Sequence, residues 1–514
     1  MTGKRGRIKV LLLEACRAPH VSSEELIRRS MLLHGLSLRN VIDRRTRAKG
    51  TEGEAGFSTV SMYGIPLGLA FVAGGVSREK FDVSHVPLIL DAYRFELDRR
   101  RLMDRIRAIE PHVVGMTLNH TADREAALGM CADIKKISKD IVTILGGVEA
   151  TFSGIEIMET ESVDFIVKGE GDVRFGLLLE NIFGDSPDPS TTGGLLFRRG
   201  GDICGTFDAV DHVDIENIRP AYDCLRLDDY IDAGVLAHVQ TSRGCPYGCS
   251  FCSHTAFWGR KMRYRSPVSV VDEVAGLAGK GVRILYFCDS TFTMNRRHVK
   301  GILEEIRDRG FTPPVIAFET HVERVDRDMV RLLSQAGVGI VALGVESADE
   351  GVLARTGGKG RDGYVRRVFE IHDWLKEEGI SMYASLVVGL PGESMRSFEA
   401  TKKMVEGLHD EGLFWADAKL AMAFPGSDLR ANPDKYGVEL TGASPWLFYD
   451  RPGFVCSGGP SEEDILKMHR ELVELNAQYV MKKDYVVARR KALEDKASKM
   501  DSLAGKKESL DWYD

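Results

Sequence analysis

The sequence predicts an α/β protein in which a doubly wound, Rossmann-like domain comes first, a partial (β/α)6 barrel follows, and a mainly helical region ends the chain. Short apolar runs alternate with helical patterns in two successive series, and this pattern loosens after Pro425. At 514 residues the chain is too long for one ordinary core. We therefore expect a first domain at 1–185, a connector at 186–229, a barrel at 230–430 and a C-terminal region at 431–514.

The first domain is predicted from apolar runs of strand length. Between the later runs lie helical patterns such as Ala122–Ile137, with apolar residues three and four positions apart. This alternation is typical of a parallel sheet with helices on both faces, which binds its ligands at the carboxyl ends of the strands. The expected strands are Ile8–Leu13, Val113–Thr117, Val142–Leu145 and Phe165–Val167.

Glycines follow two of these strands and allow a ligand to approach the backbone closely. Gly146 and Gly147 come directly after one strand, and Gly169, Glu170 and Gly171 come shortly after the next. A turn often needs glycine for its own geometry, so these residues alone do not identify a ligand. They indicate where a ligand of this domain would lie.

Two segments interrupt the alternating pattern. Residues 17–63 form a polar insertion, rich in Lys and Arg in its first part, which we interpret as a solvated excursion or, alternatively, as a lid or an anion contact. Residues 186–229 are rich in Gly, Pro and Asp and hold a predicted hairpin at Leu195–Arg198 and Ile203–Thr206. We interpret this second segment as the connector between the domains.

The second series has six strand–helix units, too few for the complete eight-unit barrel, and so predicts a partial one. Helical patterns such as Val268–Lys280 and His298–Arg309 lie between its strands. A last amphipathic helix is expected from about Ser461, with Glu462 and Glu463 in its first turn, as the helix dipole prefers. The expected strands are Ala237–Thr241, Ile284–Cys288, Val315–Glu319, Ile340–Val345, Tyr383–Val388 and Lys419–Ala423.

Three of the nine cysteines lie close together after the first predicted barrel strand: Cys245, Cys249 and Cys252. In a barrel of this kind, that loop lies at the active face. Three thiolates can hold a [4Fe-4S] cluster and leave one iron without a protein ligand, open to a small molecule. A zinc site would need a fourth ligand, and the spacing from Cys252 to His254 is awkward for that role. The pattern therefore favours the cluster over zinc.

Composition excludes several classes of protein. The net charge of −7 argues against a general nucleic-acid binder. No apolar run approaches the roughly 18 residues that a membrane helix needs, and the N-terminus lacks the apolar core of a signal peptide. The other six cysteines are scattered singly, which is a poor disulfide framework. We therefore expect a cytoplasmic protein with no transmembrane segment and no nucleic-acid partner.

Residues 243–252, RGCPYGCSFC, resemble the radical S-adenosylmethionine (SAM) superfamily, whose signature is CxxxCΦxC with an aromatic residue, here Phe251, at Φ. The resemblance implies that the three cysteines hold the cluster and that SAM binds the open iron. It further implies that an electron, from a donor such as a flavodoxin or ferredoxin, cleaves SAM to methionine and a 5′-deoxyadenosyl radical. That radical would then remove a hydrogen atom from the substrate.

Three later segments match the same superfamily after the second, fourth and fifth barrel strands. They place polar groups or glycines where related enzymes contact SAM, and their order behind the cysteines adds weight to each. The match to the fifth-strand segment GxIxGxxE is incomplete, because Ser385 or Leu386 stands where its first glycine is expected. The SAM contacts that the resemblance implies are Asp289 and Ser290, Glu346 and Ser347, and Gly389 and Gly392.

The doubly wound domain resembles the cobalamin-binding domain of the B12-dependent radical SAM class, in segments 64–70, 114–117, 145–152 and 167–171. The DxHxxG motif that supplies a lower cobalt ligand in many B12 proteins is absent. Three histidines of this domain, His20, His85 and His120, lack its context, which puts the lower ligand in doubt. The cobalamin contacts that the resemblance implies are Thr117, Gly146, Gly147, Gly169 and Glu170.

With both cofactors, the resemblance implies cobalamin-dependent methylation of an unactivated carbon on a small-molecule or lipid-like substrate. One SAM molecule would methylate cobalamin, and a second would supply the radical, while the protein positions the reactants. The first alternative is a cyclase or carbon–carbon coupling enzyme on the same scaffold. Less favoured are a methylthiotransferase, which would want a further cysteine triad and a basic RNA-binding module, and a non-enzymatic cobalamin sensor.

The sequence identifies no side chain that reacts with the substrate. Several aromatic residues and one cysteine near the C-terminus have two interpretations, because they would either line or cap a substrate pocket or simply belong to the core. These residues are Trp446, Phe448, Tyr449, Phe454 and Cys456.

Overall fold

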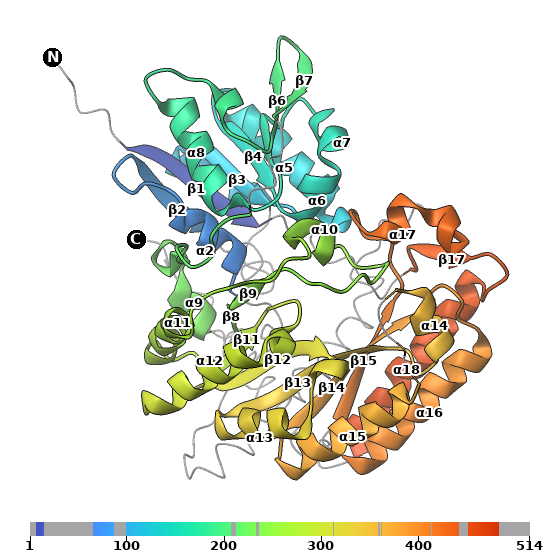
Figure 1. Cartoon of the computed structure of the whole chain (residues 1–514). Helices are drawn as coiled ribbons and strands as arrows, with labels where there is room; N and C mark the ends of the chain where they lie inside the picture. The colour runs from blue at the N-terminus through green and yellow to red at the C-terminus, as the bar shows by residue number, and fades with distance from the viewer. Residues whose placement is uncertain are drawn as a thin grey trace, which may run out of the picture.

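The structure is a computed structural model, and two α/β units can be followed in it, with the N-terminal unit in blue and teal and the second unit from green to red (Figure 1). The expectations for residues 17–63, His20, Trp446, Phe448 and Tyr449 lie outside the described residues. No helix within the described ranges is long and apolar enough to cross a membrane. The structure describes residues 7–14, 65–86, 99–206, 212–232, 236–311, 313–357, 360, 362–412, 414–441 and 451–482.

The N-terminal sheet has seven strands in the order β2-β1-β3-β4-β5-β6-β7. The first five strands in this order are parallel, so their carboxyl ends share one edge of the sheet. The four predicted strands are confirmed, and Phe81–Val86 adds one that the sequence did not predict. These strands are β1 (Ile8–Glu14), β2 (Phe81–Val86), β3 (Val113–Thr117), β4 (Val142–Gly146) and β5 (Phe165–Val167).

Helices cover both faces of this sheet, as the doubly wound prediction requires. In β1, Leu11 and Leu13 face one layer of helices while Val10 and Leu12 face the other, because successive strand residues point to opposite faces. The first layer comprises α4 (Arg99–Ile109), α5 (Arg124–Ile137), α6 (Val148–Phe152) and α7 (Gly154–Met158). The second comprises α2 (Leu67–Gly74) and α8 (Gly171–Phe183).

The predicted hairpin is confirmed as β6 (Leu195–Arg199) and β7 (Asp202–Gly205), but its place in the fold differs from the prediction. β6 pairs antiparallel with β5, so the hairpin belongs to the first sheet and not to a connector. Without β6, the outer edge of β5 would present unpaired backbone groups. Leu195 and Phe197 also complete the core on the face covered by α2 and α8.

The second sheet has six parallel strands, which confirms the predicted six-unit barrel. The last strand was predicted at Lys419–Ala423 and instead begins at Phe414. The predicted bounds were wrong because Asp417 and Lys419 are polar, and a buried strand was expected to be apolar throughout. The six strands are β8 (Ala237–Val239), β11 (Ile284–Phe287), β12 (Val315–His321), β13 (Val338–Glu346), β14 (Ser381–Val388) and β15 (Phe414–Leu420).

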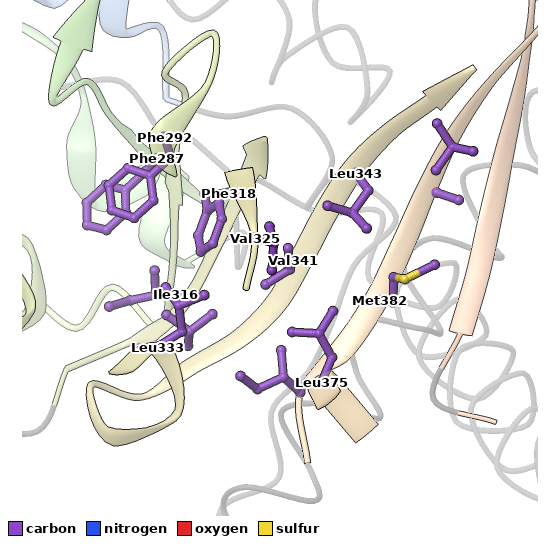
Figure 2. Close-up of a cluster of buried hydrophobic side chains, with 14 of the residues drawn as sticks. Phe287, Phe292, Ile316, Phe318, Val325, Leu333, Val341, Leu343, Leu375 and Met382 are labelled. Carbon is purple, nitrogen blue, oxygen red and sulfur yellow. The ribbon is translucent and has the colours of Figure 1, made fainter. Parts of the chain in front are cut away.

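The outer face of this sheet packs against helices to form the largest core of the protein. Figure 2 shows Phe287, Phe292 and Phe318 grouped at one end of this core, with successive ring centroids 4.8 and 4.6 Å apart. Leu343 and Met382 continue the same core on the next two strands. The covering helices are α11 (Pro267–Gly279), α12 (Arg296–Asp308), α13 (Arg327–Gln335), α14 (Glu350–Arg355), α15 (Tyr364–Glu377) and α16 (Met395–Glu411).

The C-terminal region is mainly helical but includes a two-stranded ribbon. Its elements are α17 (Asp428–Ala431), β16 (Val438–Leu440), β17 (Phe454–Cys456) and α18 (Glu462–Lys482). Phe454 is fully buried in an apolar cluster, which supports its interpretation as a core residue. α18 packs on β15, where the side chain of Asn476 bonds to both backbone groups of Ala416.

Candidate functional site

The three clustered cysteines lie on a loop that a short antiparallel ribbon closes. β9 (Ser242–Arg243) enters this loop and β10 (Arg263–Tyr264) leaves it, with Arg243 opposite Arg263. Gly244 turns the chain at φ +102°, and a Cβ there would lie 2.3 Å from the carbonyl oxygen of Lys261. Only glycine fits that position without displacing the backbone. We call residues 244–262 the cluster loop.

The cluster loop is held against the carboxyl ends of the barrel strands. The backbone amide of Ser250 donates to Thr356 and its carbonyl accepts from Leu429. The ring of Tyr247 stacks on His321 at the end of β12, with centroids 4.1 Å apart, and its hydroxyl accepts from Arg324. A short helix, α10 (His254–Trp258), completes the loop. The cysteines therefore lie at the edge of the barrel where its active face was expected.

The donor set of the loop fits an iron–sulfur cluster. Cys245, Cys249 and Cys252 form no disulfide bond and are partly exposed. Burial, and to a smaller degree the charges of Cys249 and Cys245, raises the pKa of Cys252 to about 12. The Cys252 thiolate therefore needs a positively charged metal centre to persist at neutral pH.

Zinc is less well matched to the same residues. Among the described residues, no three His, Cys, Asp or Glu side chains converge closely enough to share one metal ion. A [4Fe-4S] cluster does not require such convergence, because each thiolate binds its own iron. His254 was the candidate for a fourth zinc ligand. Its Nδ1 lies 3.1 Å from the hydroxyl oxygen of Ser290, within hydrogen-bond distance.

Asp289 follows β11 and supports the strand that enters the cluster loop. Its carboxylate accepts from the backbone amides of Thr241 and Ser242 at 2.7 and 3.0 Å, and from both of their hydroxyl groups. Burial raises the pKa of Asp289, and these hydrogen bonds oppose that rise. The structure thus gives Asp289 a role in holding β9, and its predicted contact with SAM stays a prediction.

Glu346 and Ser347 lie at the end of β13, as predicted. Glu346 is buried and adopts φ +64°, which is unusual for a residue other than glycine and typical of strained functional positions. Ser347 is fully buried, and its hydroxyl accepts from the amide of Asp349. Glu346 is also near enough to Cys252 for its charge to raise the pKa of that thiol. Of this pair, Glu346 is therefore the residue whose charge acts on a cysteine of the cluster loop.

Gly389 and Gly392 form the turn after β14, both with positive φ. The amide of Gly389 donates to the buried carboxylate of Glu393, which closes the turn. Burial raises the pKa of Glu393 to about 7. Phe251 packs beside an apolar cluster that includes Leu390, and its predicted contact with the cofactor stays a prediction. These placements leave the SAM contacts of this segment as predictions.

The residues predicted to contact cobalamin gather at the carboxyl edge of the first sheet. Thr117, Gly146 and Val167 end three neighbouring strands, and Gly169 follows the last of them. Gly147 has φ +104°, and a Cβ there would lie 2.5 Å from the side-chain oxygen of Asn119. The positive φ and the close packing of Leu118 and Asn119 therefore require glycine at this turn, and the approach of cobalamin to it stays a prediction.

Glu170, the remaining predicted cobalamin contact, forms ion pairs with residues of the barrel unit, and its contact with cobalamin stays a prediction. It bonds to Arg243 at 2.7 Å and to Arg263 at 2.6 Å, and Arg243 also forms a bidentate pair with Asp172. Burial opposes ionisation of Glu170, but the two arginines outweigh it and lower its pKa. We call Glu170, Asp172, Arg243 and Arg263 the inter-domain ion cluster.

Sequence reasoning missed the inter-domain ion cluster and a second polar group inside the barrel. On β15, Asp417 and Lys419 point away from the outer core, into the barrel, and Tyr383 of β14 donates to Asp417 at 2.9 Å. For Asp417 and Lys419 the sequence held a partial signal, because polar residues at alternate positions of a strand predict that one of its faces is polar. For Arg243, the signal was its place two residues before Cys245.

The carboxyl edges of the two sheets face each other across the cluster loop. Figure 1 shows β9 and α10 between the N-terminal sheet and the barrel strands. Phe152 at the end of α6 forms a second contact between the units, because its ring lies 6.5 Å from that of Phe257 on α10. A Cβ at Gly426 would lie 2.5 Å from the ring of Phe152. A ligand of either edge would thus lie close to the cysteines.

Two family models match this chain. The model described as the B12 binding domain matches residues 53–179, and the radical SAM superfamily model matches residues 239–405. These ranges fall within the predicted first domain and the predicted barrel. The exact domain bounds remain predictions.

Curated relatives of the chain include methyltransferases and cyclases. An uncharacterized methyltransferase of Pyrococcus horikoshii is 28% identical over 380 residues, which is 72% of this chain and 78% of the relative. The anaerobic magnesium-protoporphyrin IX monomethyl ester cyclase of Rubrivivax gelatinosus is 29% identical over 375 residues, or 71% of this chain and 65% of the cyclase.

Solved structures share the fold at low identity. The structure of the radical SAM methyltransferase TsrM of Kitasatospora setae, with cobalamin and a [4Fe-4S] cluster bound, matches with a TM-score of 0.65 at 19% identity. The match covers 85% of this chain and 81% of TsrM. The cobalamin-dependent SAM radical enzyme OxsB matches with a TM-score of 0.59 at 14% identity, over 78% of this chain and 52% of OxsB.

Proposed function

The chain belongs to the cobalamin-binding class of the radical SAM superfamily, and from this premise we propose that it methylates an unactivated carbon of a small-molecule or lipid-like substrate. One observation supports this proposal above the others. The cluster loop lies between the carboxyl edges of two α/β sheets, and Arg243 joins it to the B12-binding domain. A substrate held between these edges would have a radical source on one side and a methyl carrier on the other.

Within this proposal the chain holds and orients its cofactors. Cys245, Cys249 and Cys252 would hold the cluster, with Glu346 beside them toward SAM. The turn at Gly146–Gly147 would accommodate cobalamin against the backbone. When bound, the cluster with SAM supplies a hydrogen-abstracting radical, and cobalamin supplies the methyl group.

The second candidate is oxidative cyclisation on the same scaffold. The named cyclase of Rubrivivax gelatinosus is as similar to this chain as the named methyltransferase is, which is the observation in its favour. Both candidates use the same cysteine loop and the same upstream domain. They differ in what SAM becomes, because methyl transfer yields S-adenosylhomocysteine in addition to 5′-deoxyadenosine.

Two further parts of the proposal concern the setting of the enzyme. We propose an electron donor of the flavodoxin or ferredoxin class, because the cluster requires a one-electron reductant. We also propose a cytoplasmic location. Among the described cysteines none forms a disulfide, which fits a reducing compartment.

The test is the cofactor content and the SAM products of anaerobically purified protein. We expect iron and sulfide in the amounts of one [4Fe-4S] cluster, a cobalamin absorbance spectrum, and both S-adenosylhomocysteine and 5′-deoxyadenosine. The variant Cys249→Ala is expected to lose iron and both products. The matched variant Cys204→Ala, which changes a cysteine on β7, is expected to retain them.

Each outcome decides between the candidates. 5′-Deoxyadenosine without S-adenosylhomocysteine, in protein loaded with cobalamin, would reject methyl transfer and favour the cyclase. Iron retained in Cys249→Ala, or lost equally in Cys204→Ala, would reject the assignment of the cluster to this loop.

A further inference from the structure

Arg243 is a buried cation shared between two domains. Its side chain is 2% exposed, and those of Glu170 and Asp172 are 5% and 6% exposed. With Arg263 at 13% exposure, the four side chains of the inter-domain ion cluster carry two positive and two negative charges, and the ring of His212 lies 3.1 Å from Glu170 at its edge. Removing one member leaves an unpaired charge where water cannot solvate it, which is why such clusters resist separation of their halves.

The contacts of Arg243 give it one preferred orientation. Two parallel hydrogen bonds to Asp172, at 2.7 and 2.9 Å, match the planar fork of the guanidinium group. Phe71 of α2 and Trp258 of α10 contact the same group, with their ring centroids 5.1 and 4.7 Å from its central carbon. Groups from the B12-binding domain and from the cluster loop thus meet on one side chain.

The place of Arg243 in the chain ties this orientation to the cluster loop. It comes directly before the turn at Gly244 and two residues before Cys245. Its partner Glu170 follows the turn at Gly169, whose amide donates to Thr151 at the carboxyl edge of the first sheet. A short path of backbone and buried ion pairs therefore connects the cluster loop, through the inter-domain ion cluster, to the edge where cobalamin is expected.

We propose that Arg243 is a positioning residue that, through Glu170 and Asp172, sets the distance between the cluster loop and the carboxyl edge of the B12-binding domain. The proposal rests on the proposed function only in that both cofactors occupy these edges. Reactions between two bound groups depend steeply on placement, and a shift of about 1 Å can cost about a hundredfold in rate. The ion cluster supplies the rigidity that such placement needs.

The first experiment measures the distance between the domains directly. A nitroxide-bearing amino acid is introduced at Ile155 on α7 and at Val268 on α11, which are exposed by 67% and 52%. This route avoids thiol labels, which would react with the native cysteines. Pulsed electron paramagnetic resonance of the full chain is expected to give one narrow distance. The variants Arg243→Gln and Asp172→Asn are expected to broaden it or add a second distance.

A matched control separates positioning from general loss of a buried charge. Glu273 pairs with Arg265 at 2.6 Å, with side chains 6% and 1% exposed, and also accepts a hydrogen bond from Tyr222, which the amide oxygen of a glutamine can still accept. Glu273→Gln therefore removes an equally buried ion pair without crossing the domain boundary, and should leave the distance narrow. If Arg243→Gln does not yield folded protein, Asp172→Asn, which removes charge but little volume, decides the question.

The second experiment uses the two SAM products of the holoenzyme. 5′-Deoxyadenosine formation needs SAM at the cluster, whereas S-adenosylhomocysteine formation also needs the methyl carrier at the correct distance. In Arg243→Gln we expect the second product to form about ten- to a hundredfold more slowly, while the first changes less than about twofold. Arg243→Lys keeps the charge but not the bidentate geometry. Its rate of S-adenosylhomocysteine formation should therefore lie between those of the wild type and Arg243→Gln.

The outcomes distinguish this inference from the proposed function. Narrow, unchanged distances in both Arg243→Gln and Asp172→Asn would overturn the inference, as would an equal loss of both SAM products. If the wild-type protein binds no cobalamin and forms no S-adenosylhomocysteine, the proposed function fails. The distance measurement would still decide the role of Arg243.

Discussion

The ammonium nitrogen of Lys419 lies 3.6 Å from a carboxylate oxygen of Asp417, on the face of β15 that points into the barrel. Burial alone would lower the pKa of Lys419, but the charges of Asp417, Glu319 and Glu346 outweigh it and raise the pKa. The lysine is therefore the cation that balances several carboxylates of the barrel interior.

The variant Lys419→Met removes this cation and leaves the carboxylates facing one another. We expect a loss of about 1–3 kcal/mol in the free energy of unfolding, toward the lower end because the Lys419 side chain is 33% exposed and solvent screens part of its charge. The control Lys376→Met breaks an exposed pair with Glu411 and should cost less than about 1 kcal/mol. Urea unfolding of both variants measures the difference, and equal losses would contradict the prediction.

Glu393 is expected to make stability fall with rising pH. Burial raises its pKa in the folded protein to about 7, from an ordinary value of 4.5. The folded state thus holds an additional proton between these values, and the stabilising contribution is present in full below pH 4.5 and lost as pH rises through 7. The difference corresponds to about 3 kcal/mol at order-of-magnitude precision.

The measurement for Glu393 is urea unfolding between pH 5 and pH 8 in wild type and Glu393→Gln. The wild-type protein should lose stability relative to the variant across this range, because glutamine does not titrate. Subtracting the two curves removes the contributions of the buried histidines. The exposed Glu439→Gln serves as the control. A wild-type curve parallel to that of Glu393→Gln would show that Glu393 does not titrate in this range.

Gly244 and Gly248 provide a matched pair within the cluster loop. Gly244 has positive φ, and an added Cβ would meet backbone at 2.3 Å, whereas at Gly248 the nearest atom would be 3.4 Å away. Gly244→Ala is expected to lose most of its iron after anaerobic reconstitution and at least about 2 kcal/mol of stability. Gly248→Ala should stay close to wild type in both. Equal iron content in the two variants would argue against the geometry of this turn.

Local patterns predicted most of the fold, because the apolar periodicity of a strand or a helix can be recognised within a short stretch of sequence. The six barrel units and the doubly wound domain follow from apolar periodicity. β2 escaped prediction because Asp82 and Ser84 interrupt its apolar residues, and β15 was misplaced because Asp417 and Lys419 occupy its inner face. Periodicity cannot show which polar residues a barrel interior accepts.

The candidate site was predicted unevenly for a similar reason. The cysteines are close in sequence, so their spacing alone identified the cluster loop. Asp289 was correctly placed at a strand end, but the direction of its side chain, toward Thr241 and Ser242, depends on a neighbouring strand. Arg243 and Asp172 are 71 residues apart and belong to different domains. Their contact exists only once both domains have folded and docked.

The most direct test of carbon methylation uses SAM with a deuterated methyl group. The anaerobic holoenzyme, a one-electron reductant and a small-molecule extract of the source organism are incubated together, and products are compared by mass spectrometry with a Cys245→Ala control. We predict a product that carries an intact trideuteromethyl group on carbon and is missing from the control. A product that has lost hydrogen but gained no deuterium would contradict the account and identify the enzyme as a cyclase.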